Sequence, residues 1–444
     1  MIRSRLTLPL LVFACAHFLV PSPIRAAAEG KYGPVEILKN EESLMKTVGE
    51  YEDLFLRRGY RYASPEVQDL IARIGARLAP PPTDPYMRYR FHVLRDPEVN
   101  AFALPDGQVY LNTGLLAAMQ NEAQLSAILA HEVHHTAGHH GILEYRSVRR
   151  KAVGSLILGP FTLGLSDIFL MLSVFGHSRD LEEEADRKAL PKMLEAGYDP
   201  REMAGVFEIM QQDPEDEKPK RATAWSTHPQ LQARAGYCRD QATDLLKGVD
   251  EAPLRVEAAG YRRLVRRLSL ETVQDLIAAD YPRSAVALAG RLAAEEPADP
   301  ERQVALGDAT RALGARGAPG GESAATDEAK KENLKERAKL TRSEWEAQRL
   351  ATPEGQENLR RNLEAARRVY LHALELDPDA PGAHRGLGFA LMGLDDPESA
   401  GREFLVYLRA RPDAIDRPII LGHLKKVTET LKKRSASHDQ KTAP

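Results

Sequence analysis

Apolar residues recur at a helical spacing along most of the chain. One clear helix begins near Ser64 and ends near Leu78, where three prolines follow. Strand-like segments occur at residues 89–94 and 109–111, with a Pro-Asp-Gly turn at 105–107 between them. Helices are expected over about 41–78, 122–140, 180–196 and most of the chain beyond 253. The pattern predicts an α+β fold that is mostly helical and has one small β-sheet.

The N-terminal segment has the pattern of an export signal. Arg3 and Arg5 precede an apolar run over residues 6–20, and three alanines at 26–28 follow it. This predicts a signal peptide over residues 1–28, because the run is shorter than the roughly 20 residues that span a bilayer. Cys15 leaves open an alternative, in which the protein is anchored as a lipoprotein.

The composition is that of a globular protein and narrows the possible functions. Of 444 residues, 43% are hydrophobic and 28% are charged, which excludes collagen-like, wholly disordered and polytopic membrane proteins. The net charge of −3 shows no basic excess, so nucleic acid is not an expected partner. Two cysteines cannot build a disulfide scaffold.

The sequence HExxH at residues 131–135 carries the chemistry. On a helix, His131 and His135 lie four residues apart and share a face, so both imidazoles can bind one Zn²⁺. Glu132 lies beside them and can take a proton from water at the metal. The preceding residues are apolar, which predicts a buried helix, and buried histidines and a glutamate need a stabilising partner.

The third zinc ligand distinguishes the classes of HExxH protein. A metzincin has a histidine six residues after His135, where this chain has Gly141. The acidic run downstream offers Glu182 instead, which would complete a site of two histidines and one glutamate. Asp186 lies four residues later on the same helix face and can accept a hydrogen bond from a ligand imidazole. Alone, such an acidic run is more often a solvated helix face.

Four stretches together resemble the M48 zinc metallopeptidases, which are zincins of the gluzincin type. They are residues 99–107, the HExxH, residues 178–186, and Ser-Thr-His-Pro at 226–229 with Arg234 after it. The resemblance implies one Zn²⁺ per chain, held by His131, His135 and Glu182, with Glu132 as the catalytic residue. It also implies that Asp186 and Arg234 support the ligands. The strand beside the cleft, which we expect to hold an extended substrate, comprises Asn100, Ala101, Phe102, Ala103 and Leu104.

Other histidines have open roles. The resemblance implies two functions for His228: a fourth zinc ligand that keeps the enzyme latent, or a helper that stabilises the oxyanion; an ordinary loop histidine is the third alternative. His134 is expected to face away from the ligands and His139 to be exposed. His140 is interpreted as structural packing.

An apolar segment over residues 152–176 contains one charged residue, Asp167. It is long enough for a single bilayer crossing. One crossing, however, would place Glu182 on the opposite side from His135, and a two-span hairpin needs about 40 residues. We therefore expect short buried or lid-like pieces that contact a membrane only peripherally.

The C-terminal part resembles tetratricopeptide repeats. Leu387-Gly388 and Ala400 are thirteen residues apart, which fits the two helices of one unit. The preceding unit has Leu306-Gly307 and Ala366, sixty residues apart, so it contains an insertion of 47 residues. Such repeats stack into a solenoid that binds proteins.

The expected organisation therefore has four segments. They are a signal peptide (1–28), a zinc metallopeptidase domain (29–250), a helical repeat domain (251–431) with an insertion at about 314–356, and a disordered tail (432–444).

An exported M48 protein with such repeats resembles periplasmic members of the family. This implies an endopeptidase for unfolded or misassembled envelope proteins, acting in outer-membrane protein quality control and also as a chaperone. Its repeats would bind a protein partner such as the outer-membrane assembly machinery. The alternative is a non-proteolytic repeat scaffold with a vestigial zincin domain.

Overall fold

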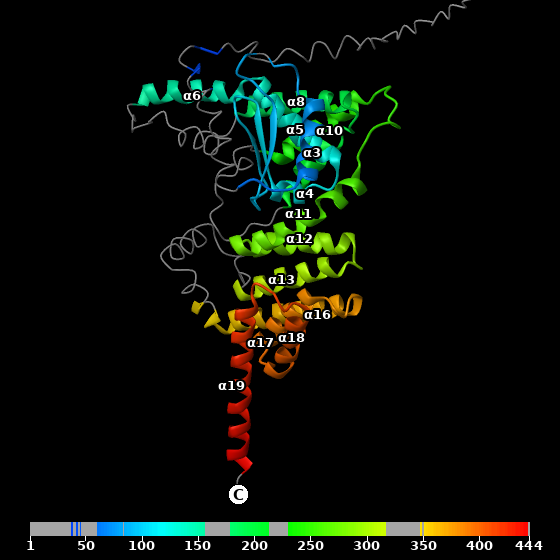
Figure 1. Ribbon diagram of the computed structural model, residues 1–444. Coiled ribbons are helices and arrows are strands. Elements are labelled where there is room, and N and C mark those ends of the chain that lie inside the picture. Colours follow the sequence, from blue (N-terminus) through cyan, green and yellow to red (C-terminus); the bar gives the residue numbers. More distant parts are fainter. Residues whose placement is uncertain are drawn as a thin grey trace, which may run out of the picture.

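The computed structural model shows two regions stacked end to end (Figure 1). The first holds a β-sheet and the helices around it, and the second is a stack of helices that ends in one long helix. The structure describes residues 37–38, 41–42, 45, 60–82, 84–155, 178–212, 230–316, 347–348 and 350–442.

Helices form most of the described residues, which confirms the mostly helical α+β class. Those of the first region are α3 (Pro65–Leu78), α4 (Thr113–Ala118), α5 (Glu122–Ala137), α6 (His140–Ser155), α8 (Arg179–Glu195), α9 (Glu202–Gln211) and α10 (Leu231–Leu245). Those of the second are α11 (Ala258–Ala279), α12 (Pro282–Glu295), α13 (Pro300–Arg316), α16 (Pro353–Leu376), α17 (Pro381–Gly393), α18 (Pro397–Ala410) and α19 (Arg417–Thr442).

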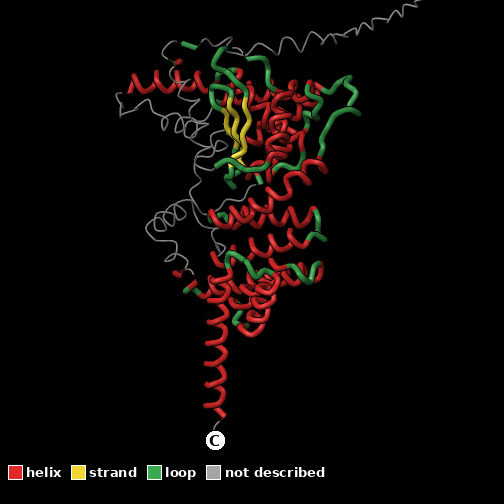
Figure 2. The backbone as a smooth tube through the Cα atoms, in the orientation of Figure 1, coloured by secondary structure: helices red, strands yellow, loops and turns green. Residues whose placement is uncertain are grey.

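The sheet has three strands and lies only in the first region (Figure 2). They are β1 (Arg90–Leu94), β2 (Ala101–Ala103) and β3 (Gln108–Asn112), in the order β1-β3-β2. β3 pairs in parallel with β1 and antiparallel with β2, so β2 forms an edge. Apolar residues of all three strands join the main hydrophobic core, where α3 packs on β1 and α5 packs on β2. The sheet thus lies directly against the helix that carries HExxH.

Helix α3 begins where its sequence predicts. The Ser64 side chain accepts a hydrogen bond from the Val67 amide at 3.4 Å, and Pro65 occupies the first turn. Its apolar face is buried in the main core, as the spacing predicts. The helix thereby forms a wall behind the sheet.

The helix expected over 122–140 is two helices. α5 ends at Ala137, and the backbone of His139 adopts a left-handed conformation with φ of 51°. That conformation interrupts the α-helical path, and α6 starts at His140 in a new direction. The helix ends two residues beyond His135, and the left-handed residue lies four residues beyond it.

Paired helices of the second region approach closely where one helix carries glycine. In α17, a Cβ on Gly388 would lie 2.6 Å from the Phe404 ring of α18. In α13, a Cβ on Gly307 would lie 2.5 Å from the Tyr370 ring of α16. The two contacts match, although a long segment separates α13 from α16 in the sequence.

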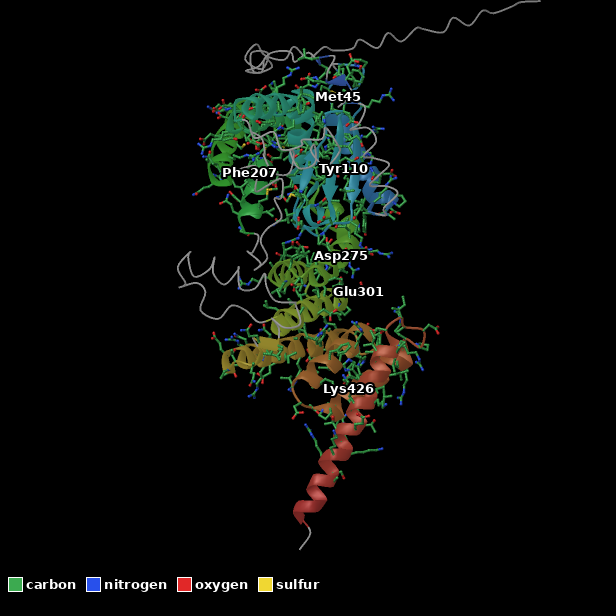
Figure 3. All side chains as sticks on the ribbon, turned by 90° about the vertical axis from the view of Figure 1, so that its left-hand side faces the viewer. Met45, Tyr110, Phe207, Asp275, Glu301 and Lys426 are labelled. Atoms are coloured by element: carbon green, nitrogen blue, oxygen red, sulfur yellow. The ribbon has the colours of Figure 1, made fainter. Side chains whose placement is uncertain are left out.

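The two regions share helix α11. Tyr261, Val265 and Leu268 on α11 belong to the main core of the first region. The boundary expected at 250 therefore lies before a helix that the first region needs. The Arg95 guanidinium also donates two hydrogen bonds to Asp275 on α11, at 2.9 and 3.0 Å. Figure 3 shows Asp275 between the sheet and the lower helices.

The tail differs from expectation. Residues 432–442, expected to be disordered, continue helix α19. No proline or glycine interrupts this stretch, and its basic residues lie toward the helix C-terminus, which stabilises a helix.

Some expectations concern residues outside the described ranges. These are the signal peptide, most of the 152–176 segment and most of the insertion. Within the described ranges, no helix combines the length and apolar character that crossing a bilayer requires.

Candidate metal centre

Helix α5 carries the two histidines on a firmly placed support. Asn121 caps its N-terminus by accepting a hydrogen bond from the Gln124 amide at 2.8 Å, and most of the helix is buried. His131 and His135 project from one face, and their Nε2 atoms are 2.9 Å apart. Both side chains are almost fully buried. The i, i+4 spacing therefore produces the convergence expected from the sequence.

Glu182 reaches the same point from α8. Its carboxylate oxygens lie 3.6 Å from His131 Nε2 and 3.3 Å from His135 Nε2. The three side chains are buried, and their ligand atoms all lie within 4.8 Å of one another.

These residues fit a zinc ion. In a tetrahedral site with bonds of about 2.0–2.1 Å, neighbouring ligand atoms are about 3.3 Å apart. The three separations of 2.9, 3.3 and 3.6 Å bracket that distance. Two imidazoles and one carboxylate are also the donor set of a catalytic zinc site that keeps a position open.

Asp186 supports His131 from behind. Its Oδ1 lies 2.9 Å from His131 Nδ1, so the ring presents Nε2 to the ligand cluster. Burial favours the neutral form of each group, but their mutual hydrogen bond and charge outweigh it. The hydrogen bond and charge of Asp186 raise the pKa of His131. The charge of Arg234, followed by the hydrogen bond and charge of His131, lowers the pKa of Asp186.

Arg234 on α10 joins the two carboxylates. It donates to Asp186 from Nε at 2.8 Å and from Nη2 at 2.7 Å, and its Nη1 lies 2.9 Å from Glu182 Oε2. The guanidinium carbon lies 4.5 Å from the centre of the Phe207 ring. Although burial disfavours the charged form, the two carboxylates raise the pKa of Arg234 above its ordinary value. Arg234 is therefore a buried cation that orients Glu182 and Asp186.

Sequence reasoning missed Tyr237. Its hydroxyl donates to Asp186 Oδ2, beside the bonds from Arg234. A helical wheel would have signalled it, because Tyr237 lies three residues after Arg234 on α10 and shares its face.

His140 contacts the second ligand. Its Nδ1 lies 2.9 Å from His135 Nδ1, and the two rings meet edge to face. Burial lowers the pKa of His140 to about 4, so the ring is neutral at neutral pH.

The neighbouring histidines occupy different surroundings. Burial lowers the pKa of His134 to about 3, and His134 is not among the three clustered ligands. The expectation that His139 is exposed is wrong: only 4% of it is accessible, and its Nε2 lies 3.4 Å from Asp84. The left-handed turn points this side chain inward instead of along a helix surface.

Glu132 follows His131 on α5 and is buried.

The expected substrate strand, residues 100–104, contains β2 and one residue on each side of it. Both flanking residues bond to β3 through the main chain: the Leu104 amide donates to the Gln108 carbonyl at 2.7 Å, and the Asn112 amide donates to the Asn100 carbonyl at 3.0 Å. Among the described residues, no strand pairs with the outer edge of β2.

His228 lies outside the described residues.

Residues 64–241 match Peptidase family M48. This segment is an M48 peptidase domain. It contains all of the clustered side chains above, from α5, α8 and α10.

Relatives of the M48 domain include proteases of two kinds. The mitochondrial metalloendopeptidase OMA1 of Schizosaccharomyces pombe is 35% identical over 33% of this chain and 45% of its own length. The beta-barrel assembly-enhancing proteases of Escherichia coli and Yersinia pestis are each 25% identical. These matches cover 41% and 51% of this chain and 40% and 53% of the relatives. The chain thus spans about half or less of the length of these relatives.

Proposed function

We propose that this protein is a zinc-dependent endopeptidase. The observation that carries the proposal is the convergence of His131, His135 and Glu182 inside an M48 domain, with Glu132 adjacent on the same helix. Bound there, a zinc ion supplies a Lewis acid that polarises the scissile carbonyl and makes water more acidic.

The protein's own residues move the proton. Glu132 takes a proton from the attacking water and then delivers it to the leaving amide nitrogen. Its burial keeps bulk water away from the carboxylate. Arg234 and Asp186 hold Glu182 and His131 in place while this happens.

Among the described residues no strand covers the outer edge of β2, and this supports an extended substrate. A peptide segment can pair with an edge strand through main-chain hydrogen bonds, which favours unfolded segments over folded domains. β2 packs against α5, so such a segment would lie beside the helix that carries Glu132.

We propose an exported protein that acts on unfolded or misassembled envelope proteins, including those of the outer membrane, and also serves as a chaperone. The N-terminal export pattern and the names of the bacterial relatives support this role. The Gly–aromatic contacts within two helix pairs favour tetratricopeptide-type units, which would bind a protein partner. The assignment of His228 stays a prediction. A complete ligand set argues against the alternative of a vestigial zincin domain.

The Glu132→Gln variant tests the proposal. It keeps the volume of the side chain and removes the base, so we expect one bound zinc per chain and a loss of casein cleavage by 10²–10⁴-fold. Glu183→Gln is the matched control, because Glu183 is half-exposed on α8 and forms an exposed ion pair with Arg187. Cleavage by Glu132→Gln at the wild-type rate would contradict the mechanism.

A further inference from the structure

We propose that His140 is a positioning residue that fixes the tautomer and the ring orientation of His135. This inference rests on the proposed zinc site and adds a residue to it. The carrying observation is the 2.9 Å separation of the two Nδ1 atoms, between rings that are both almost fully buried.

The direction of this hydrogen bond follows from counting protons. A neutral imidazole has one protonated nitrogen and one lone pair. His135 turns Nε2 toward His131 and Glu182. A zinc ion bound at Nε2 would use the lone pair of that atom, so the proton of the neutral ring must lie on Nδ1. The Nδ1–H then donates to His140 Nδ1, which must carry the lone pair. His140 therefore keeps its own proton on Nε2.

The helix break brings His140 into place. On a continuous helix, residues five apart point about 140° away from each other, so residue 140 could not face residue 135. The left-handed turn at His139 ends α5 and returns His140 to the His135 ring. Gly138 leaves the necessary room, because a Cβ there would lie 2.5 Å from His140 Nε2. The left-handed turn and Gly138 together position the His140 ring.

The two histidine ligands thus have different supports. His131 faces the carboxylate of Asp186, whereas His135 faces a second imidazole. Glu182 and Asp186 already share one buried cation, Arg234. A third carboxylate behind His135 would add an uncompensated buried charge, and an imidazole acceptor avoids that cost.

Zinc affinity of the full-length protein, measured by competition with a chromogenic chelator, tests the inference. His140→Ala removes the acceptor, and we expect a 10–100-fold weaker affinity. His140→Asn places an amide oxygen near the former Nδ1 and should retain affinity within about threefold of wild type. Gly138→Ala should weaken binding in the same way as His140→Ala, by displacing the ring. Gly290→Ala is the control, since no atom lies within 4 Å of its Cβ position.

A spectroscopic readout separates positioning from packing. The d–d spectrum of the Co²⁺-loaded protein should change in His140→Ala and be restored in His140→Asn. Wild-type affinity in His140→Ala would overturn the inference, and so would equal losses in the Ala and Asn variants, which would mean that the ring only packs. Failure of the proposed function has a different signature: Glu132→Gln would bind zinc and still cleave casein, while the histidine variants kept their order of affinities.

Discussion

Three charged side chains are buried together at the metal centre. Arg234, Asp186 and Glu182 are each 3% exposed or less. A buried ion pair is sustained by the completeness of its hydrogen bonds, and removing one partner leaves the other charge uncompensated. Arg234 contacts both carboxylates, so it is the residue whose loss would leave the most charge unpaired.

Arg234→Met should therefore destabilise the zinc-free protein strongly. We expect a decrease of about 3–5 kcal/mol in the free energy of unfolding, measured by urea denaturation in the presence of a chelator. Arg239→Met is the control, because Arg239 lies on the same helix and pairs with Glu208 where both side chains are more than half exposed. Its loss should cost at most about 1 kcal/mol. Similar losses in the two variants would refute the assignment of Arg234 as the central buried cation.

At the level of elements, glycine sets how closely helices pair. The rings of Phe404 and Tyr370 occupy the space that side chains at positions 388 and 307 would fill. Both rings are fully buried, so they have little room to move aside. The close approach of these helices thus depends on the absence of two methyl groups.

Gly388→Ala should destabilise the second region although alanine favours helices. The new methyl group meets a buried ring, and overpacking of this kind costs about 1–3 kcal/mol. In the same region, Gly290→Ala meets no neighbour and should be neutral or stabilising by up to about 1 kcal/mol. Thermal unfolding followed by circular dichroism compares the two. The idea fails if both variants shift the midpoint equally and in the same direction.

For the whole molecule, α11 and α12 connect the M48 domain to the helical stack. The buried Tyr261 hydroxyl donates to the Leu116 carbonyl at 2.7 Å, and the Tyr281 hydroxyl donates to Glu98 at 2.8 Å. Arg291 on α12 donates to the Ala117 carbonyl. Glu98 lies in the segment that leads into β2, so its contact with the helical stack helps to position the edge strand.

A fragment of residues 29–250 should consequently be less stable than one of residues 29–297. The shorter fragment loses Tyr261, Val265 and Leu268 from the main core, and burial of each contributes about 1.5–3 kcal/mol. We expect a lower midpoint of thermal unfolding for it, or aggregation through the exposed core. Equal midpoints would show that the M48 domain does not depend on α11.

Much of the architecture follows from local rules. The cap at Ser64 places α3, turn residues separate the strands, and the i, i+4 spacing places His131 beside His135. These features can be predicted from the sequence because they depend on residues a few positions apart. Glu182 was found through a motif and not through spacing, since 46 residues intervene between it and His135.

Other features arise only from long-range packing. The contact of His140 with His135 depends on a single left-handed residue, and helical periodicity in the sequence does not predict that contact. The bonds from Arg234 and Tyr237 require α10 to pack on α8, and the edge position of β2 requires β3 to pair with both other strands. Periodicity specifies which face of an element is buried, but not which element will cover it. That choice belongs to the packed core, where three residues of α11 join the M48 domain across the expected boundary.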